Sequence, residues 1–189
     1  PMYFDWLGMH GMKYANTAIQ EADVIFCIGV RFDDRITGKL DEFAPNAHII
    51  HADIDLSEGS KNVPTKVFLH GDIKLLFNNL PSSVTPKNTE WRKEWYNHLD
   101  ALRIKYPLRI PNGEAFTMPF VLNTLNKKTK EGIIVATDVG QHQMWAGQYL
   151  KKMLPDSFIT SGGLGSMGFG LPAAMGAQAA QPNKEVWCI

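Results

Sequence analysis

The run Val24-Ile25-Phe26-Cys27-Ile28-Gly29 decides the fold of the first part of the chain, because five apolar residues are closed by a glycine. Two similar runs follow at residues 48–55 and 66–72, and helical stretches are expected at 15–22, 36–43 and 73–80. Apolar strands that alternate with helices are typical of a parallel sheet covered on both faces. The first part of the chain is therefore predicted to be α/β.

The same alternation begins again near Asn112. Helices are expected at 116–125, 140–149 and 171–180, and strands at 133–138, 158–159 and 185–189. Residues 81–112 contain several prolines and polar residues, which predicts a linker, and this linker contains a helix with Trp91, Trp95, Leu99 and Leu102 at helical spacing. The fold class is thus α/β, with parallel sheets flanked by helices as parts of two doubly wound domains. The last strand has no turn after it and residues 1–4 do not look like a natural start, so truncation is expected at both ends.

Composition limits the possible partners. The 19 basic and 19 acidic side chains leave no net charge, which argues against a nucleic-acid partner or an acidic membrane surface. No apolar run is long enough to span a bilayer, and no signal peptide is visible. Cys27 and Cys188 both lie in apolar strand-like runs and are expected to be reduced, as in a cytoplasmic protein, although the sequence does not exclude a disulfide.

Ligands of parallel sheets bind at the carboxyl ends of the strands, and polar residues gather there in the first part of the chain. They are Arg31, Asp33, Asp34, Arg35, Asp53, Asp55 and Asp72. Such a cluster is usually a group of solvated ion pairs. Arginine is also the side chain best shaped to bind a phosphate or a carboxylate, so the two interpretations compete.

Two stretches of the second part also suit a ligand. Asp138 to Trp145 runs from a strand end into a helix, where backbone N–H groups with Gln141 and His142 can bind a diphosphate. A lone histidine there is more often a cap or a core partner. Ser161 to Ala174 is rich in glycine, which permits close backbone approach, but it equally suits a tight loop before a closely packed helix. It is neither a Walker loop nor a dinucleotide fingerprint. No Cys/His metal spacing is present, so no metal ligand is assigned.

Taken together, these segments resemble the large catalytic subunit of the acetolactate (acetohydroxyacid) synthase family. The matching stretches occur in the family's order and at similar spacing, and they are Leu7 to Gly11, Gly29 to Arg35, Asp53 to Asp55, Gly140 to Trp145 and Ser161 to Ala174. The segments at 31–35 and 140–144 favour the FAD-containing biosynthetic branch. By resemblance, residues 1–80 are the C-terminal part of a central FAD-binding domain, 81–112 the linker, and 113–189 the N-terminal part of a thiamine-diphosphate-binding domain. The resemblance is weakest from 81 to 111.

The resemblance implies an enzyme that decarboxylates pyruvate with thiamine diphosphate and condenses the product with a second 2-oxo acid, in branched-chain amino-acid biosynthesis. The residues implied to contact thiamine diphosphate are Val139, Gly140, Gln141, His142, Gly165 and Met167. Those implied to contact FAD are His10, Arg31, Asp53, Ile54 and Asp72. Arg35 is implied to hold the substrate carboxylate, with Met9 close by. Magnesium is implied as well, but its ligands would follow Ile189. The family's glutamate that activates the cofactor belongs to an N-terminal domain. These 189 residues alone are therefore expected to be inactive.

Other functions remain open at the level of the sequence. One alternative is another thiamine-diphosphate lyase, such as a glyoxylate carboligase or an oxo-acid decarboxylase, and a second is a non-catalytic FAD-binding module. The family implies 2-oxo acids as ligands, a homodimer or tetramer, and a possible small regulatory subunit. The sequence departs from the family at Gly59, where an isoleucine is usual.

Overall fold

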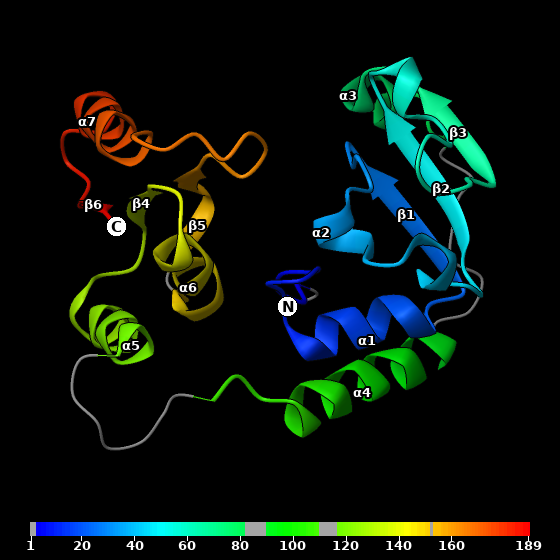
Figure 1. Cartoon of the computed structure of the whole chain (residues 1–189), viewed down its shortest axis with the longest axis horizontal. Helices are drawn as coiled ribbons and strands as arrows, with labels where there is room; N and C mark the ends of the chain where they lie inside the picture. The colour runs from blue at the N-terminus through cyan, green and yellow to red at the C-terminus, as the bar shows by residue number, and fades with distance from the viewer. Residues whose placement is uncertain (1–2, 82–89, 110–116, 152) are drawn as a thin grey trace. The chain divides into compact units, whose positions relative to one another are not determined.

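The chain folds into two compact units. The structure is a computed structural model, and it describes residues 3–81, 90–109, 117–151 and 153–189. The first unit comprises Pro1–Pro107 and the second Leu108–Ile189. Each unit contains a three-stranded parallel sheet with helices beside it (Figure 1), which confirms the predicted fold class.

The sheet of the first unit has the order β1-β2-β3, with strands β1 (Val24–Ile28), β2 (His48–Asp53) and β3 (Val67–His70). Ile28 pairs with Ala52, and Asp53 pairs with His70. Beyond the strands, Gly29 N–H donates to Ala52 O and Gly71 N–H donates to Asp53 O, both at 2.9 Å. The carboxyl ends of all three strands therefore lie in one row, as the sequence predicted.

The helices of the first unit are short except for two. They are α1 (Lys13–Glu21), α2 (Asp34–Thr37), η1 (Leu40–Glu42), η2 (Leu56–Glu58), α3 (Ile73–Asn78) and α4 (Glu90–Lys105), of which η1 and η2 are 3-10 helices. Helices α1 and α4 lie side by side (Figure 1). The single helix expected over 36–43 is wrong, because α2 ends at Thr37 and the next residue, Gly38, has a φ of 60° that leaves the right-handed helical region.

One face of the first sheet carries the core of its unit. Ile25 and Cys27 of β1 and Ile49 of β2 are buried there, against Phe32 and Phe43 among others. On the opposite face of β1, Val24, Phe26 and Ile28 are 54%, 43% and 44% exposed. Strand β1 therefore alternates between buried and exposed residues, whereas the sequence predicted a sheet covered on both faces.

The second unit is built around a fully buried central strand. Its sheet has the order β5-β4-β6, with strands β4 (Ile133–Thr137), β5 (Met153–Thr160) and β6 (Val186–Cys188), and its helices are α5 (Met118–Lys128), α6 (Gln141–Tyr149) and α7 (Gly170–Ala180). All five residues of β4 are buried. The core includes Leu122 of α5, Val135 of β4 and Ala146 of α6, each fully buried. Strand β5 is longer than the predicted 158–159 and shifts register against β4 between Ile133 and Val135.

The region predicted as a linker contains helix α4, as expected. Its contacts with α1 place it in the first unit. Residues 82–89, 110–112 and the side chain of Trp91 lie outside the described residues. Among the helices that the structure describes, none is both long enough and apolar enough to cross a membrane.

Candidate functional site

Asp138 organises the carboxyl end of strand β4 in the second unit. Its Oδ1 accepts hydrogen bonds from the N–H groups of Val139 at 2.8 Å and Gly168 at 3.0 Å, and its Oδ2 accepts one from Gly170 N–H at 3.0 Å. These backbone donors, Val139 first and then Gly170 and Gly168, hold the pKa of Asp138 below its usual value. One carboxylate therefore ties the glycine-rich loop to the strand end.

Gly170 permits this arrangement because α7 begins in direct contact with the end of β4. A Cβ atom at Gly170 would lie 2.6 Å from Asp138 N and 2.9 Å from Thr137 C. No side chain fits at that distance from a backbone. Gly170 is thus required by the close packing of α7 against β4, which agrees with the alternative of a tight loop before a closely packed helix.

A group of polar side chains fastens the ends of β4, β5 and α6 together. Thr137 Oγ1 lies 2.7 Å from Thr160 Oγ1, and Gln143 Nε2 donates to Thr160 Oγ1 at 2.7 Å. In the loop that follows, Ser166 N–H donates to Ser161 Oγ at 2.9 Å. Gln143 is therefore an anchor of α6 and faces the strand ends.

Four of the residues expected to contact thiamine diphosphate lie next to each other. A Cβ atom at Gly165 would lie 3.9 Å from Val139 Cγ1, and one at Gly140 would lie 2.9 Å from the His142 ring. Gln141 and Met167 are exposed, and Met167 precedes the Gly168 amide that Asp138 binds. The structure brings the two predicted segments together; the contacts with the cofactor itself stay predictions.

The N-terminus of helix α6 is the part of this site that suits a diphosphate. Its N-cap is Gly140, with a φ of 155°, and no side chain caps the first turn. The amides of an uncapped helix start carry partial positive charge and bind phosphate oxygens. Glycines at 140, 165 and 170 keep side chains away from the same region. The residues present therefore fit a diphosphate-bearing cofactor.

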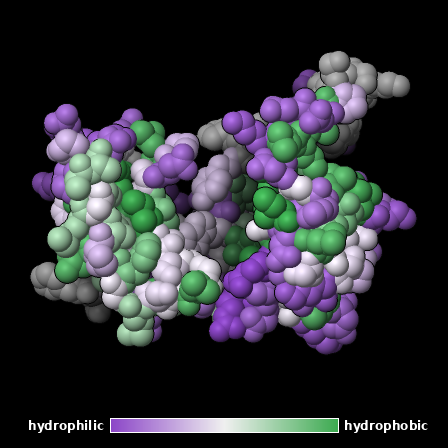
Figure 2. Space-filling view, turned by 90° about the horizontal axis from the view of Figure 1, so that it is seen from above, coloured by the Kyte–Doolittle hydropathy of each residue, from purple (hydrophilic) through white to green (hydrophobic). Residues whose placement is uncertain are grey.

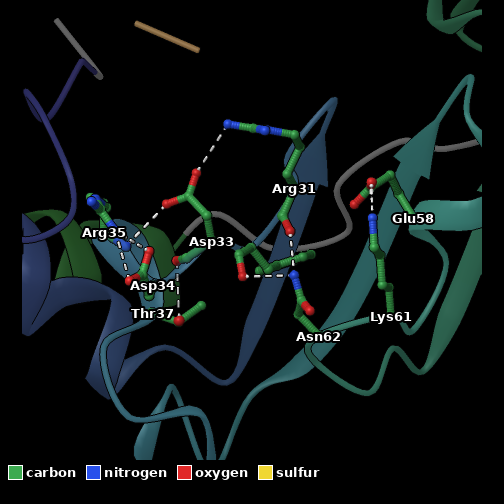
Figure 3. A network of polar contacts seen from close by, with 9 residues as sticks. Arg31, Asp33, Asp34, Arg35, Thr37, Glu58, Lys61 and Asn62 are labelled. Carbon is green, nitrogen blue, oxygen red and sulfur yellow. Dashed lines mark hydrogen bonds and ion pairs between the residues drawn. The ribbon is translucent and has the colours of Figure 1, made fainter. Parts of the chain in front are cut away.

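In the first unit, the segment from Arg31 to Arg35 forms exposed ion pairs (Figure 3). Arg35 Nη1 donates to both carboxylate oxygens of Asp34 at 2.7 Å, and this bond lowers the pKa of Asp34. Both side chains are about 70% exposed, at 68% and 71%. Pairs of this kind contribute little to stability. Arg35 can therefore exchange Asp34 for the carboxylate of a ligand at small cost.

Met9 and Arg35 are held together through their backbones. Met9 N–H donates to Arg35 O at 2.6 Å, and a Cβ atom at Gly8 would lie 2.5 Å from the same oxygen. The Asn16 side chain fixes this loop, because it donates to Gly8 O at 2.9 Å and accepts from Gly8 N–H at 2.8 Å. A cavity of about 340 Å³ is lined by residues of this loop, of α1 and of α2. The expected neighbours of the substrate therefore lie beside one cavity.

The residues expected to contact FAD are distributed over the strand ends and the Met9 loop. Arg31 follows β1 and is exposed, Ile54 follows β2 and is 70% exposed, and His10 is an exposed residue of the Met9 loop. The Asp72 carboxylate caps helix α3 by accepting from Lys74 N–H and Leu75 N–H.

Asp53 is mostly covered. Its side chain is only 10% exposed, and its Oδ1 accepts from Asp55 N–H at 2.8 Å. The carboxylates of Asp53 and Asp72 thus fix the backbone at the strand ends by accepting hydrogen bonds from it. Ile54 and Arg31 are exposed at the same strand ends.

Sequence reasoning did not assign several residues that build these sites. Asp138 was named only as the first residue of the stretch 138–145 and was given no role, although a carboxylate directly after a buried strand is a usable signal, and Asn16 was not named. Among the described residues, no group of three or more His, Cys, Asp or Glu side chains could hold a metal ion.

Comparison with known families assigns both units. Residues 1–80 match the family model described as "Thiamine pyrophosphate enzyme, central domain". Residues 138–189 match the model described as "Thiamine pyrophosphate enzyme, C-terminal TPP binding domain", so the two matches together cover more than half of the chain. The chain belongs to the thiamine pyrophosphate enzyme family.

Within this family the chain is similar to acetolactate synthases. It is 48% identical to the large subunit of acetolactate synthase isozyme 2 from Escherichia coli (strain K12), over all of this chain and 34% of that protein. It is 45% identical to the chloroplastic acetolactate synthase 2 of Nicotiana tabacum, over 95% of this chain and 28% of the relative. For the acetolactate synthase of Mycobacterium leprae (strain TN) the identity is 43%, over 96% and 30%. The resemblance found in the sequence is confirmed, and the chain spans about a third of the length of these relatives.

Proposed function

We propose that this chain is part of an acetolactate synthase. The enzyme decarboxylates pyruvate and joins the two-carbon unit to pyruvate or 2-oxobutyrate, the first common step towards valine, leucine and isoleucine. The relatives that match the whole chain carry this name. The observation that supports it most directly is the Asp138 carboxylate, which holds the Gly168–Gly170 turn beside the uncapped start of α6.

Thiamine diphosphate is the proposed cofactor of the second unit. When bound, it supplies a carbon centre that adds to the keto group of pyruvate and accepts the electrons released on loss of carbon dioxide. The backbone amides at the start of α6, with Gln141 and His142, bind its diphosphate. Val139, Gly165 and Met167 pack against its rings. Asp138 keeps these segments in position through its hydrogen bonds from Val139, Gly168 and Gly170.

Arg35 is the proposed ligand of the substrate carboxylate. A guanidinium can bind a carboxylate through two parallel hydrogen bonds, which orients a 2-oxo acid as well as attracting it. Its present partner Asp34 is exposed and adjacent in sequence, so replacement by a substrate requires no buried group to be uncovered. Met9, 68% exposed beside it, provides an apolar surface for the rest of the substrate.

FAD is the proposed second cofactor and binds along the row of strand ends in the first unit. Three features support this site: the exposed Arg31 suits a phosphate, Ile54 offers an apolar contact, and the glycines after β1 and β3 have φ values of 61° and 146°. His10, Asp53 and Asp72 complete the proposed set.

The proposal includes three further points about the whole protein. Magnesium neutralises the diphosphate. The enzyme is a homodimer or tetramer, with a possible small regulatory subunit. It is cytoplasmic, which agrees with the free thiols of Cys27 and Cys188.

The decisive experiment is a cofactor titration of the intact protein with pyruvate as substrate. Acetolactate is expected to form only when both thiamine diphosphate and magnesium are added. Arg35→Lys is expected to raise KM for pyruvate roughly tenfold with a smaller change in kcat, since the paired hydrogen bonds are lost. Lys93→Arg, at a surface ion pair with Glu90, is the matched control.

Other results would select a different function. Acetaldehyde as the main product would indicate an oxo-acid decarboxylase, and carboligation of glyoxylate would indicate a glyoxylate carboligase. Binding of FAD without thiamine diphosphate would indicate a flavin-binding module.

A further inference from the structure

His51 is an unusual residue at the centre of strand β2. Its side chain is 0% exposed, and neither ring nitrogen has a hydrogen-bond partner. The ring packs edge-on against Phe32 and Phe68, with ring centroids 5.2 and 5.3 Å away. A buried polar group without a partner destabilises a fold, and a phenylalanine would fill the same space without that cost. A histidine here therefore calls for a role other than packing.

The position of His51 connects two segments of the proposed flavin site. Phe32, which contacts its ring, belongs to the Arg31 loop and is buried with a φ of 50°. That strained residue is held by Asn62, whose amide donates to Arg31 O at 3.0 Å and to Phe32 O at 3.2 Å (Figure 3). The ring of His51 thus supports the Arg31 loop through its contact with Phe32.

The other side of His51 faces the turn after β2. Its Nε2 lies 3.5 Å from Asp53 Oδ2, within the range of an ion pair but longer than a hydrogen bond. The second oxygen of Asp53 binds Asp55 N–H, so the carboxylate fixes the turn that carries Ile54. In the same turn, His70 Nε2 lies 3.0 Å from Ile54 O. His70 contacts the backbone of the turn directly, and His51 lies beside the Asp53 carboxylate that fixes it.

We propose that His51 is a positioning residue for flavin binding: its Nε2 atom lies within ion-pair range of Asp53 Oδ2, and its ring supports Phe32, so that the Ile54 turn and the Arg31 loop face the dinucleotide together. This inference rests on the proposed flavin site. His51 does not contact FAD, because it is fully covered by protein.

The test measures FAD affinity separately from folding. The flavin-free intact protein is titrated with FAD, and binding is followed by flavin fluorescence. His51→Phe keeps the ring and removes the donor, so FAD is expected to bind about tenfold more weakly. Its melting temperature without flavin is expected to be no lower than that of the wild type, because two unpaired nitrogens are removed.

Two further variants distinguish positioning from packing. His51→Gln retains an N–H donor and is expected to recover most of the FAD affinity. His48→Gln, at an exposed histidine three residues earlier on β2, is the matched control and is expected to bind FAD as the wild type does. A purely structural role would lower the melting temperature in His51→Gln and leave FAD affinity unchanged in both His51 variants.

The outcomes are separable from those of the proposed function. If the wild type does not bind FAD, the proposed flavin site is wrong and this inference with it. If the wild type binds FAD and His51→Phe binds it equally well, only the role of His51 is refuted. Should His51→Phe not fold, a cycle of His51→Gln with Asp53→Asn replaces it: coupled losses of FAD affinity support the proposal, and independent, additive losses overturn it.

Discussion

Gly170→Ala is the sharpest test of the loop that Asp138 organises. The added Cβ atom would lie 2.6 Å from Asp138 N, 2.9 Å from Thr137 C and 3.0 Å from Asp138 Cα. All three are backbone atoms at the end of the central strand, so they cannot move as a flexible side chain would. Overpacking of this kind costs about 1–3 kcal/mol, and we expect the upper end of that range. For a unit of this size, the melting temperature should fall by roughly 10–20 °C.

Gly176→Ala provides the matched control on the same helix. Apart from its chain neighbours and the nearby backbone of α7, no described atom lies within 4 Å of the place where its Cβ would be. Alanine is the better helix former by up to about 1 kcal/mol, so this variant should melt a few degrees higher than the wild type. Thermal unfolding followed by circular dichroism measures both, and a titration with thiamine diphosphate should show weaker binding only for Gly170→Ala. Equal melting temperatures and equal cofactor affinities for the two variants would refute the close-approach argument.

Three other predictions concern Asp138, Leu122 and the thiols. Because backbone N–H groups lower the pKa of Asp138 in the folded state, its stabilising effect is present above the unfolded pKa of about 4 and is lost as the pH falls through the folded value. Urea midpoints of the wild type and Asp138→Asn should therefore converge towards low pH, and a constant difference from pH 6 to 2 would contradict this. Leu122→Ala should lower the free energy of unfolding by about 2–5 kcal/mol, because Leu122 is fully buried. The control Leu164→Ala should lower it by roughly 0.5 kcal/mol or less, because the Leu164 side chain is 90% exposed. Similar denaturation midpoints for the two variants would argue against the core assignment. Burial raises the pKa of Cys27 to about 11, so iodoacetamide at pH 8 should label the exposed Cys188 first, as peptide mass spectrometry would show, and equal labelling rates would exclude the predicted difference.

The strands were predictable where burial is complete. The five residues of β4, four of them apolar, are all buried, and the runs at β1 and β2 also form strands in the expected order. Strand β5 was found only in part, because Pro155 and Asp156 within it resemble a turn in the sequence. Asp156 has a φ of 62°, which shows that the local signal for a turn is real although pairing with β4 continues.

The residue types of the candidate sites were predictable from the sequence. The residues that hold those sites in position were not. Asp138 binds amides about thirty residues later in the chain, a relation that only the folded structure reveals. Asn16 looks in the sequence like any polar residue of an amphipathic helix. Gly59 is a third example: a Cβ atom there would lie 2.9 Å from the Phe68 ring, so the missing side chain makes room for a ring that packs on His51.

The sequence pattern also did not predict which hydrophobic residues are exposed at the surface. Figure 2 shows such residues among hydrophilic ones on the face that it presents. Leu164 and Met167 of the glycine-rich loop are 90% and 83% exposed. The residues beside Met167 are fixed by hydrogen bonds, from Ser166 N–H to Ser161 Oγ and from Gly168 N–H to Asp138 Oδ1.

The paired amide of Asn16 makes the Met9 loop an extension of helix α1. Because the amide gives one hydrogen bond and takes another, the loop cannot slide along the helix without breaking both. Helix α1 in turn lies against α4, where Glu21 contacts His98. A tilt of α4 that moves α1 would therefore also move the loop that contains Met9. Helix α4, from the segment expected to resemble the family least, is thus connected through α1 to a residue expected to touch the substrate.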